Sequence, residues 1–113
     1  MKSKIVALSK NEEFKSLLNQ KKISNKYVVI FFGRLENRNI SKLNISFVVK
    51  KKIGNAVNRN KIKRRLRNII NEAIKSVNLK FNYSYLVIAK PTMLNKEYTI
   101  MKETLFRDLE RIR

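Results

Sequence analysis

The segment from Lys51 to Ala73 combines dense positive charge with apolar residues at helical spacing. Six of the nine residues from Arg59 to Arg67 are Lys or Arg. An α-helix turns by about 100° per residue, which places the apolar residues of this segment on one stripe. Such a stripe has to be covered by a core. The sequence therefore predicts a helix from about Asn58 to Val77, packed through Ile62, Leu66, Ile69, Ile70, Ala73, Ile74 and Val77.

The remaining surface of this helix carries cations and amides, which we call the cation ridge: Arg59, Asn60, Lys63, Arg64 and Arg67. These residues fall within roughly 140° of one another around the helix axis. The simplest interpretation of a charged helix face is that it is exposed to solvent. An ordinary exposed face, however, carries charges of both signs and pairs Glu with Lys four residues apart. Here the helix has no acid before Glu72, which favours a polyanionic ligand. Arg suits phosphate oxygens, and the Asn60 amide suits a base edge or a ribose hydroxyl.

The charge of the whole chain points to the same class of ligand. The 113 residues include 27 Lys or Arg and 8 Asp or Glu, for a net charge of +19. No acid lies between Glu36 and Glu72, whereas eleven Lys or Arg do. A field of one sign repels itself, and a polyanion that releases counterions on contact relieves that repulsion. We therefore expect residues 1–113 to form a single domain that binds a polyanion such as RNA, not an enzyme for small neutral substrates.

Several other classes are excluded or disfavoured by composition. The chain has no Cys and no His, so it has neither disulfides nor the commonest general base and metal ligand. Its scattered acids form no convincing carboxylate cluster for a metal-dependent nuclease. We expect no catalytic residue and no metal site in the chain itself. The longest apolar run, Tyr27 to Phe32, is too short to span a bilayer, and the N-terminus has no signal-peptide core. These features predict a cytoplasmic protein with no membrane partner.

The remaining elements complete an α+β fold. Ser9 and Glu12 have the spacing of a capping box, which predicts a short helix from near Lys10 to near Gln20. A C-terminal amphipathic helix is predicted by Tyr98, Met101, Leu105, Leu109 and Ile112. Strands are predicted at 27–32, 43–50 and 85–89, with a polar loop at 33–42 and a helix stop at Asn78. The order α-β-β-α-β-α indicates a single two-layer α/β sandwich.

Within the second strand, Leu43, Ile45, Phe47 and Val49 share one face, which should be the core face. The third strand is continuously apolar, which favours a central position. The strand from Tyr27 to Phe32 is apolar on both faces, so one face lies either under a helix or open to ligand. Phe14, Leu18 and Phe31 are most simply core residues, but beside a basic surface they could also form a stacking platform for unpaired bases.

The central segment also resembles a known motif. Lys52-x-Gly54-Asn55-Ala56-Val57-x-Arg59-Asn60-x-x-Lys63-Arg64-x-x-Arg67 is similar to the signature of the bacterial ribonuclease P protein subunit. The early segment Asn11-Glu12-Glu13-Phe14 and the late strand Leu86-Val87-Ile88-Ala89-Lys90 fit as well, so the likeness covers nearly the whole chain.

The resemblance implies a left-handed β-α-β crossover through the basic helix. It also implies that the chain is a non-catalytic subunit that assembles with a catalytic RNA. Together they would form an endoribonuclease that removes the 5′ leader of precursor tRNA. The expected partners are that RNA and the precursor tRNA, with no obligate protein partner evident. No cofactor is expected on the protein alone, because magnesium is held mainly by the RNA.

Carried over residue by residue, the resemblance assigns two sets of contacts. The expected RNA-binding residues are Lys51, Lys52, Asn55, Arg59, Asn60, Lys61, Lys63, Arg64 and Arg67. The expected lining of the leader cleft is Phe14, Leu18, Phe31 and Lys50. The sequence departs from the family pattern at four positions. Leu18 stands where an aromatic residue is frequent, so stacking would depend mostly on Phe14 and Phe31. Lys50 stands in place of a small hydroxyl residue, Ser46 in place of a glycine, and Ser84 in place of an aspartate.

Two rival functions remain on the sequence alone. A structural RNA-binding protein, such as a ribosomal protein or an RNA chaperone, would explain the charge. It would not explain the run from Gly54 to Val57 or the apolar cleft positions. A protein lying on anionic membrane through its basic helix would also fit the charge. The apolar stripe of the basic helix argues against membrane binding, because it lacks Trp and Phe and is needed for the core.

Overall fold

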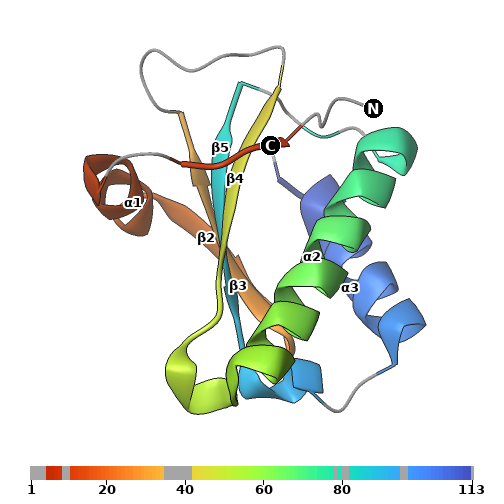
Figure 1. Ribbon diagram of the computed structural model, residues 1–113. Coiled ribbons are helices and arrows are strands. Elements are labelled where there is room, and N and C mark those ends of the chain that lie inside the picture. The colour runs from red at the N-terminus through yellow and green to blue at the C-terminus, as the bar shows by residue number, and fades with distance from the viewer. Residues whose placement is uncertain are drawn as a thin grey trace.

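A five-stranded sheet carries helices on both of its faces (Figure 1). The computed structural model describes residues 5–8, 11–34, 42–77, 79, 82–94 and 97–112. The strands are β1 (Ile5–Val6), β2 (Lys21–Ser24), β3 (Val28–Gly33), β4 (Leu43–Val48) and β5 (Ser84–Ala89). The helices are α1 (Asn11–Leu18), α2 (Ala56–Ser76) and α3 (Tyr98–Glu110), with 3-10 turns η1 (Lys51–Ile53) and η2 (Pro91–Leu94).

The strands lie in the order β1-β4-β5-β3-β2, so β5 is central, as its continuous hydrophobicity predicts. β1, β4 and β5 are mutually parallel, whereas β3 is antiparallel to β5 and β2 is antiparallel to β3. α2 connects the neighbouring parallel strands β4 and β5, which makes a β-α-β crossover. The left-handed sense that the resemblance implies for this crossover stays a prediction.

One sheet face, which we call the helix-pair face, is covered by α2 and α3 (Figure 1). The two-residue alternation of β4 is confirmed there, because Leu43, Ile45 and Val49 are buried in the core and Phe47 packs against it. The predicted stripe of α2 is also confirmed, since Ile62, Leu66, Ile69, Ile70 and Ala73 are buried in the same cluster. The predicted apolar positions of α3 complete this core through Met101, Leu105, Leu109 and Ile112.

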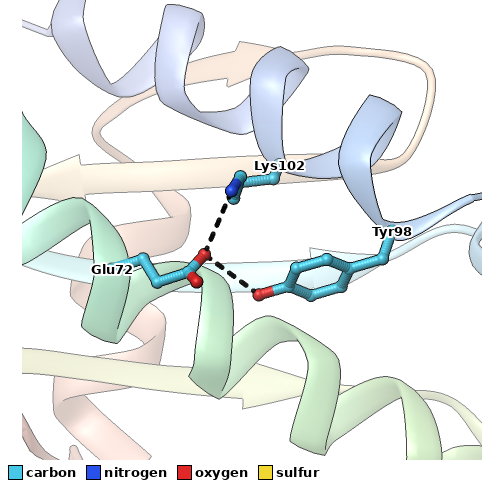
Figure 2. Close-up of polar contacts among 3 residues, drawn as sticks. All are labelled: Glu72, Tyr98 and Lys102. Carbon is cyan, nitrogen blue, oxygen red and sulfur yellow. Dashed lines mark hydrogen bonds and ion pairs between the residues drawn. The ribbon is translucent and has the colours of Figure 1, made fainter.

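A polar cluster fastens α3 to the carboxyl half of α2. Glu72 of α2 accepts a hydrogen bond from the Tyr98 hydroxyl at 3.2 Å and pairs with the Lys102 ammonium at 3.6 Å (Figure 2). Burial, the negative charge of Glu72 and the hydrogen bond to Glu72 together raise the pKa of Tyr98 above its usual value of 10.0. The neutral phenol is therefore the form that holds this contact.

The opposite face of the sheet, the α1 face, is covered by one short helix (Figure 1). Leu17 of α1 is fully buried and clusters with Leu8 and with Leu86 of β5. The sheet with α2 and α3 confirms the α+β sandwich, and α1 adds a short partial layer on its second side. The apolar second face of the strand at 27–32 therefore lies beside a helix.

Sequence patterns missed the two edge strands. β1 has only two residues, and β2 reads Lys-Lys-Ile-Ser, a polar sequence that suits an exposed edge. α2 begins at Ala56, two residues before the predicted start, because Asn55 caps it; β4 ends at Val48, because the chain then turns into η1. The predictions at Ser9 and Asn78 and most of the loop at 33–42 lie outside the described residues.

Candidate nucleic-acid interface

Positive charge surrounds the start of α2. The Asn55 side chain accepts a hydrogen bond from the Asn58 backbone N–H at 2.9 Å, which fixes the helix start. Lys51 and Lys52 precede it in η1 and are exposed, as is Asn55 itself. The helix macrodipole adds partial positive charge at this end. This turn therefore favours an anion.

The cation ridge continues from that turn along α2. Asn60, Arg64 and Arg67 of the ridge are exposed, and Arg59 and Lys63 are half-buried. Lys61, beside the ridge, is exposed as well. Within the described parts of the chain, no carboxylate pairs with a cation from Lys50 to Arg67; the two ion pairs that the structure shows, Lys102–Glu72 and Arg111–Asp108, lie elsewhere. The ridge is thus uncompensated positive charge held on a rigid helix.

The α1 face offers apolar surface that is only partly covered. Phe14, Phe31, Val48 and Ile88, which we call the α1-face patch, are half-buried and pack against the cluster of Leu8, Leu17 and Leu86. The register aligns Leu86 with Phe31 and Ile88 with Val48 across neighbouring strands. The patch is therefore continuous over β3, β5 and β4.

Leu18 differs from its predicted companions, because 47% of it is exposed. It lies four residues after Phe14, so the two side chains are neighbours along one side of α1. Lys50, the fourth predicted cleft residue, is exposed and immediately precedes η1. The structure therefore brings Phe14 and Phe31 together over one core cluster and leaves Leu18 and Lys50 at the surface.

A hollow of about 280 Å³ connects the two predicted sites at the side of the sheet where β4 extends past its short partner β1, which we call the β4 edge. Lys63 and Arg67 of the cation ridge line it on one side, and Phe14 of the patch lines it on another. The described residues that complete its lining are Ile5, Ala7, Ile45, Ser46, Phe47 and Val48. The ridge and the patch, predicted as separate surfaces, thus meet around one opening.

Ser46 shapes this opening. Its hydroxyl oxygen accepts a hydrogen bond from the Leu8 backbone N–H at 2.8 Å, which ties the N-terminal segment to the edge of β4. A glycine at this position would have no such acceptor. The Ser46 hydroxyl therefore has a structural role at the rim of the hollow.

Two cations near the patch were not singled out from the sequence. The Lys22 ammonium lies 5.9 Å from the centre of the Phe31 ring, within the range of a cation–π contact. The Lys90 ammonium donates to the Ser24 hydroxyl at 2.9 Å and to the Asn25 carbonyl, which fixes it near the end of β5. Neither lysine belongs to a recognisable binding motif. Their positions beside the patch could have been predicted only from the pairing of the strands.

Other kinds of site find little support in the described residues. They contain no group of three or more His, Cys, Asp or Glu side chains that could hold a metal ion. Within the same residues, no helix has both the length and the apolar character needed to cross a membrane.

Comparison with known proteins identifies the family. The family model described as Ribonuclease P matches residues 3–113. The chain belongs to the ribonuclease P protein family. Among relatives, it is 36% identical to the ribonuclease P protein component of Carboxydothermus hydrogenoformans, with 87% of this chain and 83% of that protein covered. It is 31% identical to the ribonuclease P protein component of Mycoplasma mycoides subsp. mycoides, with both chains fully covered.

A solved structure of the same family has the same fold. The ribonuclease P protein from Thermotoga maritima superposes with a TM-score of 0.79 at 25% identity, over 96% of this chain and 98% of that one. Sequence and fold therefore agree on the family, and the rival of a structural RNA-binding protein of another kind is not favoured.

Proposed function

We propose that this protein is the subunit of ribonuclease P that binds the catalytic RNA through α2 and η1 and binds the 5′ leader of precursor tRNA on the α1 face. Its role is to promote endonucleolytic removal of the leader, which matures the 5′ end of tRNA. The observation that carries the proposal is the hollow at the β4 edge, where Lys63 and Arg67 lie beside Phe14. Phosphate-binding and base-stacking groups adjoin there, as a single-stranded RNA requires.

The two surfaces would perform different tasks. The RNA-binding set, Lys51, Lys52, Asn55, Arg59, Asn60, Lys61, Lys63, Arg64 and Arg67, would contact phosphates and sugars of the catalytic RNA. The leader set, Phe14, Leu18, Phe31 and Lys50, would hold unpaired leader nucleotides, and Lys22 and Lys90 extend it. The uncompensated charge of the ridge supports the first assignment, and the partly covered aromatic patch supports the second.

We assign no chemical step to side chains of this chain. In this proposal the magnesium ions of the holoenzyme are held by the RNA. The chain would count as a hydrolase only as part of that ribonucleoprotein. A cytoplasmic location and the absence of an obligate protein partner remain part of the proposal.

Reconstitution tests this proposal. The protein is added to a bacterial ribonuclease P RNA at low magnesium, and cleavage of precursor tRNA is followed; we expect stimulation. Arg64→Ala should weaken binding to the catalytic RNA, because the exposed guanidinium is a phosphate ligand. The magnitude of the salt slope of binding should fall by about 0.7 to 0.9 for one lost contact. Arg107→Ala, which removes an exposed Arg from α3, is the matched control and should change neither quantity.

The outcomes separate the candidate functions. No stimulation of cleavage by the wild-type protein would overturn the proposed role. Stimulation that Arg64→Ala and Arg107→Ala reduce equally would show that net charge, rather than the cation ridge, determines binding to the catalytic RNA.

A further inference from the structure

A second hollow lies at the corner of the sheet where α1 connects to β2. It has a volume of about 460 Å³, within the range of small-molecule sites. Its described lining combines amides, cations and aromatic rings, and we call it the corner pocket: Asn19, Gln20, Lys21, Phe32, Gly33, Arg34 and Tyr83. β3 runs antiparallel to β4 and β5, so its carboxyl end and this pocket lie at the end of the sheet opposite the start of α2.

Two aromatic rings form one wall of the corner pocket. The Phe32 and Tyr83 ring centroids are 5.9 Å apart, with the rings tilted by 37°. The Arg34 guanidinium carbon lies 6.0 Å from the centre of the Tyr83 ring, within range of a cation–π contact. Phe32 is buried, whereas Tyr83 is half-buried and Arg34 exposed. Tyr83 is thus a half-buried ring with an exposed cation beside it.

The other wall is built by side-chain amides over a glycine. A Cβ at Gly33 would lie 1.9 Å from the Gln20 amide oxygen, so only glycine leaves the Gln20 side chain in its place. The Gln20 amide nitrogen donates to the Ser16 hydroxyl and to the Arg34 carbonyl, both at 3.4 Å. The Asn19 amide nitrogen likewise donates to the Lys15 carbonyl at 3.3 Å. The side-chain oxygens of Gln20 and Asn19 are therefore the groups that can accept a hydrogen bond from the edge of a base.

The corner pocket and the α1-face patch are reached from opposite sides of the same strand. Lys22 pairs with Phe31, which belongs to the patch, and Lys21 pairs with Phe32, which belongs to the pocket. Because successive side chains of a strand point to opposite faces, the two lysines lie on either side of the β2 edge. β2 is the last strand of the sheet, so a flexible strand of RNA can cross this edge.

We infer that the corner pocket binds one unpaired nucleotide of the precursor leader, farther toward the 5′ end than the nucleotides on the α1-face patch. The base stacks on Tyr83, its edge faces Asn19 and Gln20, and Lys21 and Arg34 neutralise the flanking phosphates. The net charge of +19 and the absence of carboxylates from the described lining favour this anionic occupant. The inference rests on the proposed function, because the leader must first occupy the patch.

Leader length gives the decisive test. The holoenzyme is reconstituted, and its affinity is measured for precursors whose leader is lengthened one nucleotide at a time. Affinity should rise once as the patch fills and again when the leader reaches the corner pocket. Tyr83→Leu should remove the second rise, a loss of roughly 5- to 150-fold, the range expected for one base–aromatic stack. Tyr83→Phe should retain it.

Arg34→Ala keeps the test decisive if Tyr83→Leu does not fold, because Arg34 is exposed. It should reduce the second rise and lower the magnitude of the salt slope by about 0.7 for long leaders alone. Arg107→Ala is the matched control and should behave like the wild type. A 4-thiouridine placed at the leader position of the second rise should cross-link to the pocket on irradiation.

The failure of this inference differs from the failure of the proposed function. If Phe14→Ala weakens leader binding while Arg34→Ala and Tyr83→Leu match the wild type at every length, the corner pocket is not a leader site and the patch assignment stands. Equal losses for short and long leaders would also overturn the inference. If leader-bearing and mature tRNA bind the wild-type holoenzyme equally, both assignments are wrong.

Discussion

The two faces of the sheet are built from similar strands but are covered very differently. On the helix-pair face, α2 and α3 bury a large core, and apolar residues such as Leu66 and Met101 are fully inaccessible. On the α1 face, a helix of eight residues buries Leu17 and leaves Phe14 and Phe31 half-exposed. The strands supply apolar residues to both sides, so the length of the covering helices decides which face is core and which is available to a ligand.

Charge follows the same division. The cation ridge borders the α1 face through the hollow at the β4 edge, and within the described residues its cations have no acidic partners. Where α2 packs against α3, acids do have cationic partners, because Glu72 pairs with Lys102 and Asp108 with Arg111. These paired charges are less favourable for RNA than the unpaired cations of the ridge. The contact between α2 and α3 is therefore a stabilising side of the molecule, whereas the proposed binding surfaces are the cation ridge, the α1-face patch and the corner pocket at the β2 edge.

The largest expected effect is on stability and belongs to the helix-pair face. Leu66→Ala should lower the free energy of unfolding by about 2–5 kcal/mol, because it leaves a cavity in a fully buried site. Leu18→Ala removes the same side chain from α1, where 47% of it is exposed, and should change that free energy by no more than about 0.5 kcal/mol. Urea unfolding measures both. Similar losses for the two variants would mean that α1 covers its face as completely as α2 and α3 cover theirs.

The second prediction separates binding from stability. Phe14→Ala should weaken affinity for leader-bearing precursor by roughly 5- to 150-fold through the lost stacking surface, and leave affinity for mature tRNA unchanged. Phe106→Ala is the matched variant, since Phe106 is half-buried against the helix-pair core. It should lower the unfolding free energy and leave leader affinity intact. Loss of leader affinity in both variants would contradict the division between the faces.

Local patterns predicted most of the helix-pair face because its signals are periodic. The alternation from Leu43 to Val49 and the stripe from Ile62 to Ala73 each specify an element and its buried side. The α1 face could not be assembled in this way. Phe14, Phe31 and Ile88 come from three separate elements, and they are brought together by the pairing of β3 with β5 and by the packing of α1 on the sheet.

The corner pocket shows the same limit more strongly. Arg34 and Tyr83 lie far apart in the sequence, and the edge strand that carries Lys21 was not predicted because its composition is polar. The family signature helped at α2, where it names consecutive residues. It assigned no role to Lys22 or Lys90, whose positions beside the patch depend on strand pairing.

A smaller effect is expected at the start of α2. Asn55→Ala should lower the free energy of unfolding by about 0.5–2 kcal/mol, because the Asn58 N–H loses its acceptor. Asn55→Ser keeps a capping oxygen and should retain most of the stability. Binding of the catalytic RNA by the two variants then tests the predicted contact. If Asn55→Ser is stable but binds RNA as weakly as Asn55→Ala, the amide itself contacts RNA; if it binds like the wild type, Asn55 acts through the helix start.

The smallest effect concerns the contact between α2 and α3. Tyr98→Phe should lower the unfolding free energy by no more than about 1 kcal/mol at neutral pH, because the Glu72 hydrogen bond is partly exposed. The folded-state pKa of Tyr98 is raised above its unfolded value, so its contribution is fully present below pH 10.0 and is lost as the pH rises through the folded pKa. Urea unfolding across this alkaline range should show wild type and Tyr98→Phe converging. Because the contact lies on the stabilising side, leader affinity at neutral pH should be the same for both; a change in that affinity would show that the two faces are coupled through α2.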